Sequence, residues 1–337
     1  MQSLRLNVKT VIRFFSSNNP LNVFILFFLG ILIKLPYFLT PVIPQGSSTD
    51  GFLYLQLLNW VQPAGNGFPA IYPIITCLFL FTQAVTFNGL INDLKLFSSP
   101  QYLIGFAYLF ITSMIPNWNV LSPGLIINSI MVWALPHMIG LYHNQKPKGQ
   151  LFNIGFGFGV CSFIYFPSVY LLLLLIIALA LFRPLRISEW LVTIVGVLTP
   201  FYFLMVYFFV WDHMDQVSKI IPHHSLVLPD IIFNWQFWLS FSLISAPVVI
   251  GLLLSMRYTV RMVVQVRKSW SLMIYYLSLA FFLPFINNYG GINQFVMTAV
   301  PMSIFCAAFY WFPRKKLIPE LTIWAGFAWI VINYFSA

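Results

Sequence analysis

The sequence predicts an all-α membrane protein, a polytopic helical bundle that crosses a bilayer about 10–11 times. Of its 337 residues, 60% are hydrophobic and only 7% are charged, and the mean hydropathy is +0.87. Soluble domains carry about 25% charged residues, which excludes a soluble protein of this size. The apolar residues form solid runs, such as the one from Leu171 to Leu181. A membrane β-barrel would show alternating segments instead.

Each membrane-crossing helix needs about 20 mainly apolar residues. The stretch 152–182 is long for one helix, and Phe166-Pro167 interrupts it at its centre, so it is predicted to form a hairpin of two crossings. Glycines 155, 157 and 159 permit close helix packing there. The whole chain, 1–337, is predicted to be a single transmembrane domain. Its predicted spans are 21–39, 68–87, 102–116, 122–141, 152–165, 167–182, 189–210, 236–256, 271–287, 295–312 and 318–335.

The distribution of basic residues predicts the topology, because cytoplasmic connections are enriched in Lys and Arg. With a cytoplasmic N-terminus, only Lys219 falls in an outer loop and Lys34 inside a span. We therefore expect a multi-pass protein of the cell inner membrane. The net charge of +10 then reflects topology and not nucleic-acid binding. An odd number of spans places the C-terminus outside.

Three further segments have predicted roles. Residues 1–20 mix apolar side chains with Arg and Lys, which is typical of a cytoplasmic amphipathic helix at the membrane surface. Residues 40–67 form the first periplasmic loop, and the short apolar segment from Phe52 to Trp60 within it is expected to lie along the membrane. Residues 211–235 form a large periplasmic loop.

The first periplasmic loop contains one carboxylate, Asp50, immediately before the predicted interfacial helix. A carboxylate held there can act as a general base on a hydroxyl or amide acceptor. It can equally cap the helix, because Asp is a preferred N-cap residue. The two roles are compatible, and Asp50 is the candidate catalytic residue.

Other polar residues of the outer half are candidates for substrate binding. Lys34 can snorkel to lipid phosphates, pair with Asp50, or hold the phosphate of a lipid-linked substrate. The loop 211–235 is either a solvated loop or a ligand source, with His213 and Lys219 as binding candidates. Asp212 and Asp50 are possible ligands of a divalent cation, although the spacing fits no zinc signature. Asn293 belongs to a turn whose amides can hydrogen-bond a sugar or headgroup.

The residues from Ser16 to Asn22, followed by an apolar span ending Lys34-Leu35-Pro36, resemble an uncharacterised family of polytopic inner-membrane proteins of Bacteroidota. That family has no assigned activity. The resemblance therefore indicates the kind of organism and cell envelope more than the function.

At the level of architecture, the chain is similar to the GT-C superfamily of glycosyltransferases. Asp50, four residues before Tyr54, matches their acidic first outer loop, and the hairpin 152–182 and the segment 293–308 also resemble theirs. The resemblance implies a polyprenyl-phosphate-linked sugar as donor. Two features depart from it: the loop has one acid where many of these enzymes have two, and the last outer loop has no cation. Lys34, Lys219 or His213 would have to replace that cation.

These observations leave two main hypotheses. The first is a glycosyltransferase-like enzyme acting on a lipid-linked sugar at the periplasmic face. The second is a non-catalytic membrane scaffold or accessory subunit of a cell-envelope complex, for which the aromatic content of 19% would provide helix-packing surfaces. A transporter is disfavoured because no chain of acidic residues crosses the spans. Expected partners are membrane lipids, a polyprenyl-phosphate-linked sugar and other membrane subunits, but no nucleic acid.

Overall fold

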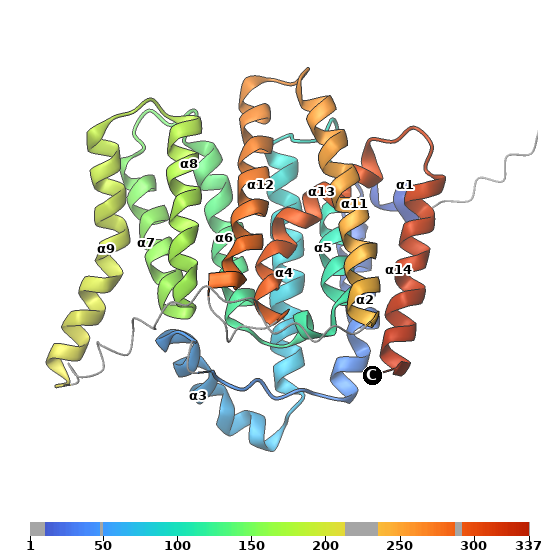
Figure 1. Ribbon diagram of the computed structural model, residues 1–337, viewed down its shortest axis with the longest axis horizontal. Coiled ribbons are helices and arrows are strands. Elements are labelled where there is room, and N and C mark those ends of the chain that lie inside the picture. The colour runs from blue at the N-terminus through green and yellow to red at the C-terminus, as the bar shows by residue number, and fades with distance from the viewer. Residues whose placement is uncertain (1–10, 48–49, 213–234, 287–291, 337) are drawn as a thin grey trace, which may run out of the picture.

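The computed structural model describes residues 11–47, 50–212, 235–286 and 292–336. Within these residues the chain is helical and has no strand, although one antiparallel bridge pairs Asp50 with Tyr165. Most helices stand side by side, and one lies across an end of the bundle (Figure 1). The helices are α1 (Val11–Phe15), α2 (Leu21–Leu39), α3 (Phe52–Gly67), α4 (Ile71–Asp93), α5 (Leu103–Met114), η1 (Pro116–Asn119), α6 (Pro123–Gly140), α7 (Lys148–Ile164), η2 (Phe166–Leu171), α8 (Leu172–Phe182), α9 (Ile187–Val210), α11 (Trp235–Thr259), α12 (Val264–Phe282), η4 (Leu283–Ile286), η5 (Ile292–Thr298), α13 (Ala299–Trp311) and α14 (Leu317–Ser336).

Every predicted span coincides with a helix, but not every helix is long enough to cross a bilayer. In the described part of the chain, 8 helices have sufficient length and hydropathy: α2, α4, α6, α9, α11, α12 with η4, η5 with α13, and α14. The others are α5, α7 and the η2–α8 segment. All 12 residues of α5 are buried, so neighbouring helices surround it and it need not match the thickness of the membrane.

The predicted break of the 152–182 hairpin is present, but neither of its two arms is among the helices long enough to cross a bilayer, so the two crossings stay a prediction. The α7 helix ends at Ile164, and Pro167 lies in the first turn of η2. Glycines allow α7 to pack closely on α9: a Cβ added at Gly155 or Gly159 would lie 2.6 Å from a backbone carbonyl oxygen of α9. Only glycine permits backbones to approach this closely.

The two ends of the bundle differ in charge. The connections α4–α5, α6–α7, α8–α9, α11–α12 and α13–α14 lie together with α1 at one end (Figure 1). We call this the basic end, and the opposite end, with α3 and the last turn of α14, the distal end. The basic residues of the described chain therefore gather at one end, as predicted. The side of the membrane that each end faces stays a prediction. The basic end holds Arg13, Lys95, Lys146, Lys148, Arg183, Arg186, Arg257, Arg261, Arg267, Lys268, Arg314, Lys315 and Lys316.

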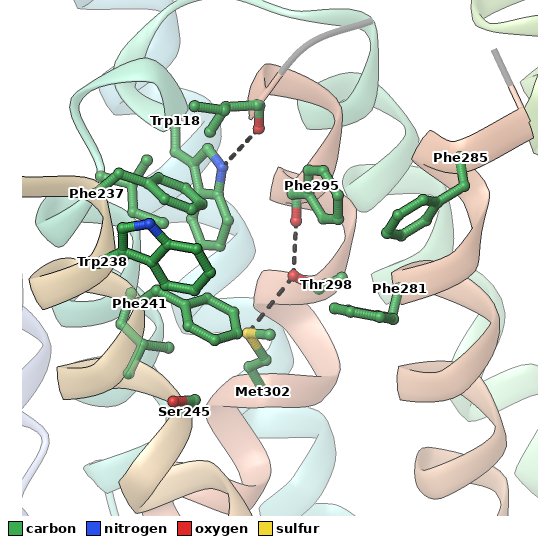
Figure 2. Close-up of a pocket in the computed structure, with 13 residues that line it drawn as sticks. Trp118, Phe237, Trp238, Phe241, Ser245, Phe281, Phe285, Phe295, Thr298 and Met302 are labelled. Atoms are coloured by element: carbon green, nitrogen blue, oxygen red, sulfur yellow. Dashed lines mark hydrogen bonds between the residues drawn. The ribbon is translucent and has the colours of Figure 1, made fainter. Parts of the chain in front are cut away.

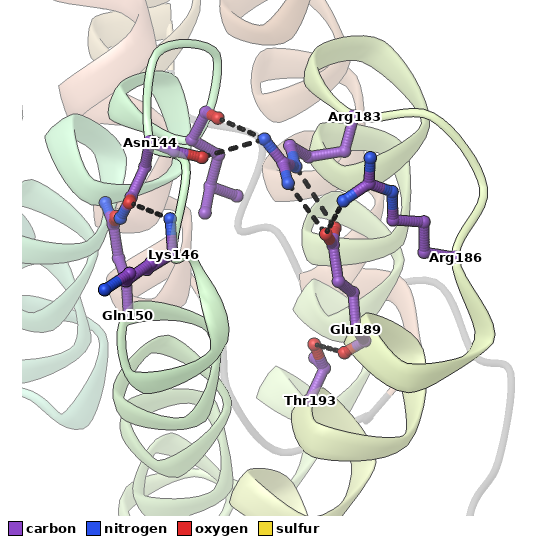
Figure 3. A network of polar contacts seen from close by, with 8 residues as sticks. Asn144, Lys146, Gln150, Arg183, Arg186, Glu189 and Thr193 are labelled. Carbon is purple, nitrogen blue, oxygen red and sulfur yellow. Dashed lines mark hydrogen bonds and ion pairs between the residues drawn. The ribbon is translucent and has the colours of Figure 1, made fainter.

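A buried ion pair organises part of the basic end (Figure 3). Arg183 donates to both carboxylate oxygens of Glu189, at 2.7 Å from Nη2 and 3.1 Å from Nε. Its Nη1 donates to the backbone oxygen of Asn144 at 2.9 Å. The α8–α9 connection is thus tied to the α6–α7 connection.

The helix α1 packs its apolar side chains on the bundle and leaves Arg13 exposed, and its place at a membrane surface stays a prediction. Ile12 and Phe15 are buried, and Phe15 stacks on Phe106 with ring centroids 4.9 Å apart. The backbone N–H of Val11 donates to Glu320 Oε1 at 2.8 Å. Its apolar side chains are covered by protein, which offers closer packing than headgroups do. The remainder of the predicted segment, residues 1–10, lies outside the described residues.

A chain of hydrogen bonds inside the bundle connects four elements. Gln83 of α4 donates to the Leu125 carbonyl at 2.8 Å and accepts from Tyr108 of α5 at 2.5 Å. Asn128 of α6 donates to the Val296 carbonyl of η5 at 2.8 Å. Buried polar groups that are satisfied in this way fix the relative positions of helices. They hold η5 against α6 at the distal end.

Candidate functional site at the distal end

A polar cleft that opens to the surface lies at the distal end. Three separate parts of the chain form it: the first connection with the start of α3, the start of α6, and η5. Three residues that the sequence singles out, Asp50, Tyr54 and Asn293, meet there although they are far apart in the chain. The described lining residues are Pro44, Gln45, Ser47, Asp50, Tyr54, Val120, Leu121, Ser122, Pro123, Asn293 and Gln294.

Backbone contacts with the α7–α8 hairpin position Asp50. Besides the bridge to Tyr165, the N–H of Gly51 donates to the Ile164 carbonyl at 3.0 Å. The carboxylate accepts a hydrogen bond from the N–H of Ser47 at 2.8 Å through Oδ2. The predicted capping role of Asp50 is wrong, because Gly51 is the N-cap residue of α3 and no side chain caps that helix. Asp50 precedes the cap by one residue, and its carboxylate turns back to the preceding loop.

Asp50 is half-buried and carries the only charge among the described residues of the cleft. Burial raises its pKa above the ordinary 3.8, and the hydrogen bond from Ser47 partly opposes this effect. The Tyr54 hydroxyl donates to the Leu121 carbonyl at 2.9 Å. Burial, and secondarily the Asp50 charge, raise the pKa of Tyr54 above its ordinary value. Tyr54 is therefore a neutral phenol that holds α3 against the start of α6.

Three oxygen-bearing side chains of the cleft have a buried oxygen with no hydrogen-bond partner among the described residues: Ser122 Oγ, Asn293 Oδ1 and Gln294 Oε1. Ser122 occupies the N-cap position of α6, yet its hydroxyl makes no capping hydrogen bond. Ser122 and Gln294 are only 3% and 4% exposed. Gln294 ends the polar turn that the sequence offers as a possible sugar- or headgroup-binding turn, whereas Ser122 was not singled out from the sequence.

Contacts on both sides of η5 hold Asn293 and Gln294 in place. The Trp118 indole N–H donates to the Ile292 carbonyl at 3.0 Å, and Asn128 holds the Val296 carbonyl. The two amide side chains are thus presented by a short helix whose backbone is fixed on either side of them.

Lys34 does not belong to the cleft, which corrects its predicted roles. It is 2% exposed, and its Nζ donates to Asn119 Oδ1 and, at 3.4 Å, to Thr112 Oγ1. It neither snorkels outward nor pairs with Asp50. The Asn119 amide is itself oriented by donation to the Thr112 carbonyl at 2.9 Å. The face of α2 that carries Lys34 meets α5 and η1, where these acceptors satisfy the ammonium group inside the bundle.

The remaining predicted residues are not brought to the cleft by the described structure. Asp212 follows the last turn of α9, is exposed, and has a positive φ of 54°. His213 and Lys219 lie outside the described residues. No group of three or more His, Cys, Asp or Glu side chains that could hold a metal occurs in the described ranges.

A second, apolar pocket lies beside the cleft, between α11, α12 and the η5–α13 segment (Figure 2). Trp238, Phe241 and Phe281 in its wall are partly exposed at the outside of the bundle. The cavity and the cleft share η5, with Ile292 and Phe295 on the cavity side and the residues between them on the cleft side. The cavity is lined by Ile115, Trp118, Phe237, Trp238, Phe241, Ile244, Ser245, Phe281, Phe285, Ile292, Phe295, Thr298 and Met302.

The fold and the site together define a multi-pass helical membrane protein with a polar cleft and an adjoining aromatic cavity at its distal end. No protein-family model matches the chain, and no curated protein or solved structure is significantly similar to it. The class of protein is therefore defined by its helices and by this site.

Proposed function

We propose that this protein is an inner-membrane enzyme of the GT-C-like glycosyltransferase type that uses a lipid-linked sugar at its distal, periplasmic end. One observation carries the proposal. Asp50, Tyr54 and Asn293, from opposite halves of the chain, line a single polar cleft. A polar cleft with one carboxylate and no cation among its described residues suits proton abstraction from an acceptor.

In this mechanism the acceptor hydroxyl oxygen attacks the anomeric carbon of the sugar. The bond from that carbon to the phosphate oxygen breaks, the lipid phosphate leaves, and Asp50 takes the hydroxyl proton. Burial raises the pKa of Asp50, which makes its carboxylate a stronger base than a solvated one. The Ser47 N–H orients the carboxylate at 2.8 Å.

The aromatic cavity is the proposed place for the hydrocarbon chain of the lipid carrier. Ser245 in its wall is ten residues from the start of α11, or about 15 Å along the helix, so the cavity extends toward the middle of the membrane. The leaving phosphate also needs nearby positive charge. Since Lys34 is held elsewhere, Lys219 and His213 of the loop 211–235 are the proposed source.

The test is sugar transfer from a polyprenyl-phosphate sugar by the purified full chain. The Asp50→Asn variant should lose about 100-fold or more in rate, which is the contribution of a general base. Asp212→Asn is the matched control, because it removes the same charge at the same end from an exposed residue outside the cleft. Equal transfer by wild type and the Asp50→Asn variant would remove Asp50 from the mechanism.

The alternative is a membrane scaffold or accessory subunit, and the exposed aromatic side chains of α9 favour it. Tyr202, Phe203, Phe209 and Trp211 lie exposed near its distal end. They would pack against helices of a partner. Replacing Tyr202 and Phe203 by leucine should then release a co-purifying membrane subunit, whereas lipid contact alone predicts no change in what co-purifies.

A further inference from the structure

The cleft contains more hydrogen-bond acceptors than its own donors satisfy. Ser122 Oγ, Asn293 Oδ1 and Gln294 Oε1 are buried there without partners among the described residues, and Asp50 adds a carboxylate. The Ser122 hydroxyl can donate or accept, but the two amide oxygens only accept, so a ligand that completes the site must bring donors for them. No described residue that lines the cleft is cationic, so the ligand must also bring the compensating positive charge.

We propose that the Asp50 cleft binds the primary ammonium group of an aminophospholipid of the phosphatidylethanolamine type. An ammonium group has three N–H donors and one positive charge. These donors and this charge match the Asp50 carboxylate and the unpaired oxygens that line the same cleft. This inference deepens the proposed function, since it rests on the same cleft and names the class of lipid that enters beside Asp50.

The start of α6 makes a zwitterionic headgroup a better match than a free amine. Pro123, its first residue, lines the cleft. A helix N-terminus carries about half a positive elementary charge, which favours the phosphate of the same headgroup.

Two other ligand classes fit these contacts less well. A quaternary ammonium, as in phosphatidylcholine, has the charge but no N–H donor, so it would leave the buried oxygens unpaired. A hard divalent cation prefers six or more oxygens, usually with several carboxylates. The described cleft supplies one carboxylate.

The test measures lipid binding to the delipidated full chain by native mass spectrometry and by thermal stabilisation in detergent. The probes are phosphatidylethanolamine, phosphatidylcholine and phosphatidylglycerol with identical acyl chains, and free ethanolamine. Phosphatidylethanolamine should bind about tenfold or more tightly than the other two lipids, as loss of charge-assisted hydrogen bonds predicts. Free ethanolamine should give no stabilisation at the same concentration, because it lacks the phosphate and the chain.

Single substitutions in the cleft test whether phosphatidylethanolamine binds there. Asp50→Asn and Gln294→Met should each weaken phosphatidylethanolamine binding about tenfold, and Asp212→Asn should leave it unchanged. The Gln294 variant keeps the test valid if the Asp50 variant does not fold. Equal binding of the three lipids, insensitivity to both cleft variants, or Asp50-dependent stabilisation by Mg²⁺ in place of the lipid would overturn the inference. If the protein prefers phosphatidylethanolamine but transfers no sugar, only the proposed enzyme is refuted. If it transfers sugar but binds the three lipids equally, only the inference is refuted.

Discussion

Asp50 and Tyr165 are joined by an antiparallel β-bridge, which fastens the first connection of the chain to the tip of the α7–α8 hairpin. The residue after Asp50 makes this contact possible. A Cβ added at Gly51 would lie 2.1 Å from the Phe163 carbonyl oxygen, so only glycine permits the backbones to approach this closely. The position of the cleft carboxylate therefore depends on a contact between segments more than 100 residues apart.

Substituting Gly51→Ala should detach the Asp50 segment from the hairpin. We expect a loss of about 1–3 kcal/mol, typical of overpacking, together with loss of the ligand-binding function of the cleft. Thermal unfolding in detergent measures the first effect. Gly67→Ala is the matched control, because an added Cβ there meets nothing within 4 Å, and the same loss in both variants would argue against a specific contact at Gly51.

The Arg183–Glu189 pair should contribute strongly to stability, because both side chains are largely buried, at 11% and 4% exposed. Glu189→Gln leaves the Arg183 charge unpaired and should cost about 3 kcal/mol. Arg186 lies 3.8 Å from the same carboxylate but is 61% exposed, so Arg186→Gln should cost less than about 1 kcal/mol. Thermal unfolding of the two variants compares these costs, and equal effects would contradict the assignment of Arg183 as the main partner.

The pKa of Asp50 predicts a stability change with pH. Because burial raises this pKa in the folded protein, the folded state binds the proton more tightly than the unfolded chain does. The free energy of unfolding should then fall as pH rises from the ordinary pKa of 3.8 to the raised folded value, and stay level above it. The measurement is the difference between wild type and the Asp50→Asn variant in thermal unfolding midpoint across this range. A constant difference would show that the pKa is the same in both states.

The membrane orientation can be tested with single cysteines. Gln45→Cys at the distal end should react with an impermeant maleimide in intact cells, and Gln145→Cys at the basic end only after permeabilisation, as the positive-inside rule requires. Both positions are exposed. The native Cys77, Cys161 and Cys306 would first be replaced by serine. The reverse pattern of labelling would move the cleft to the cytoplasm and refute a periplasmic site.

Hydropathy predicted where the helices lie but not how far each one extends. Every apolar run became a helix because backbone groups in lipid must pair internally. The run at 102–116 became the shorter helix α5, since its residues contact protein on all sides and no membrane thickness sets its length. Apolar composition does not distinguish a lipid-facing run from one enclosed by other helices.

The cleft was only partly predictable. Asp50, Tyr54 and Asn293 were identified through their polarity and a resemblance, and the structure places them together. Lys34 was misassigned because its acceptor, Asn119, is 85 residues further along the chain. Ser122 was not predicted, because its unpaired hydroxyl becomes apparent only when the start of α6 is packed in the fold.

The buried Lys34 has a consequence for how the protein is made. A lysine costs up to about 3 kcal/mol at the centre of a membrane helix and less toward its end, where Lys34 lies, and its acceptors, Asn119 and Thr112, are synthesised more than 70 residues later. Until then the helix relies on its Phe, Leu and Ile residues to remain inserted. The ammonium group of α2 therefore gains its acceptors only when α5 and η1 have been synthesised, and truncated nascent chains should hold α2 less firmly in the bilayer than the finished protein does.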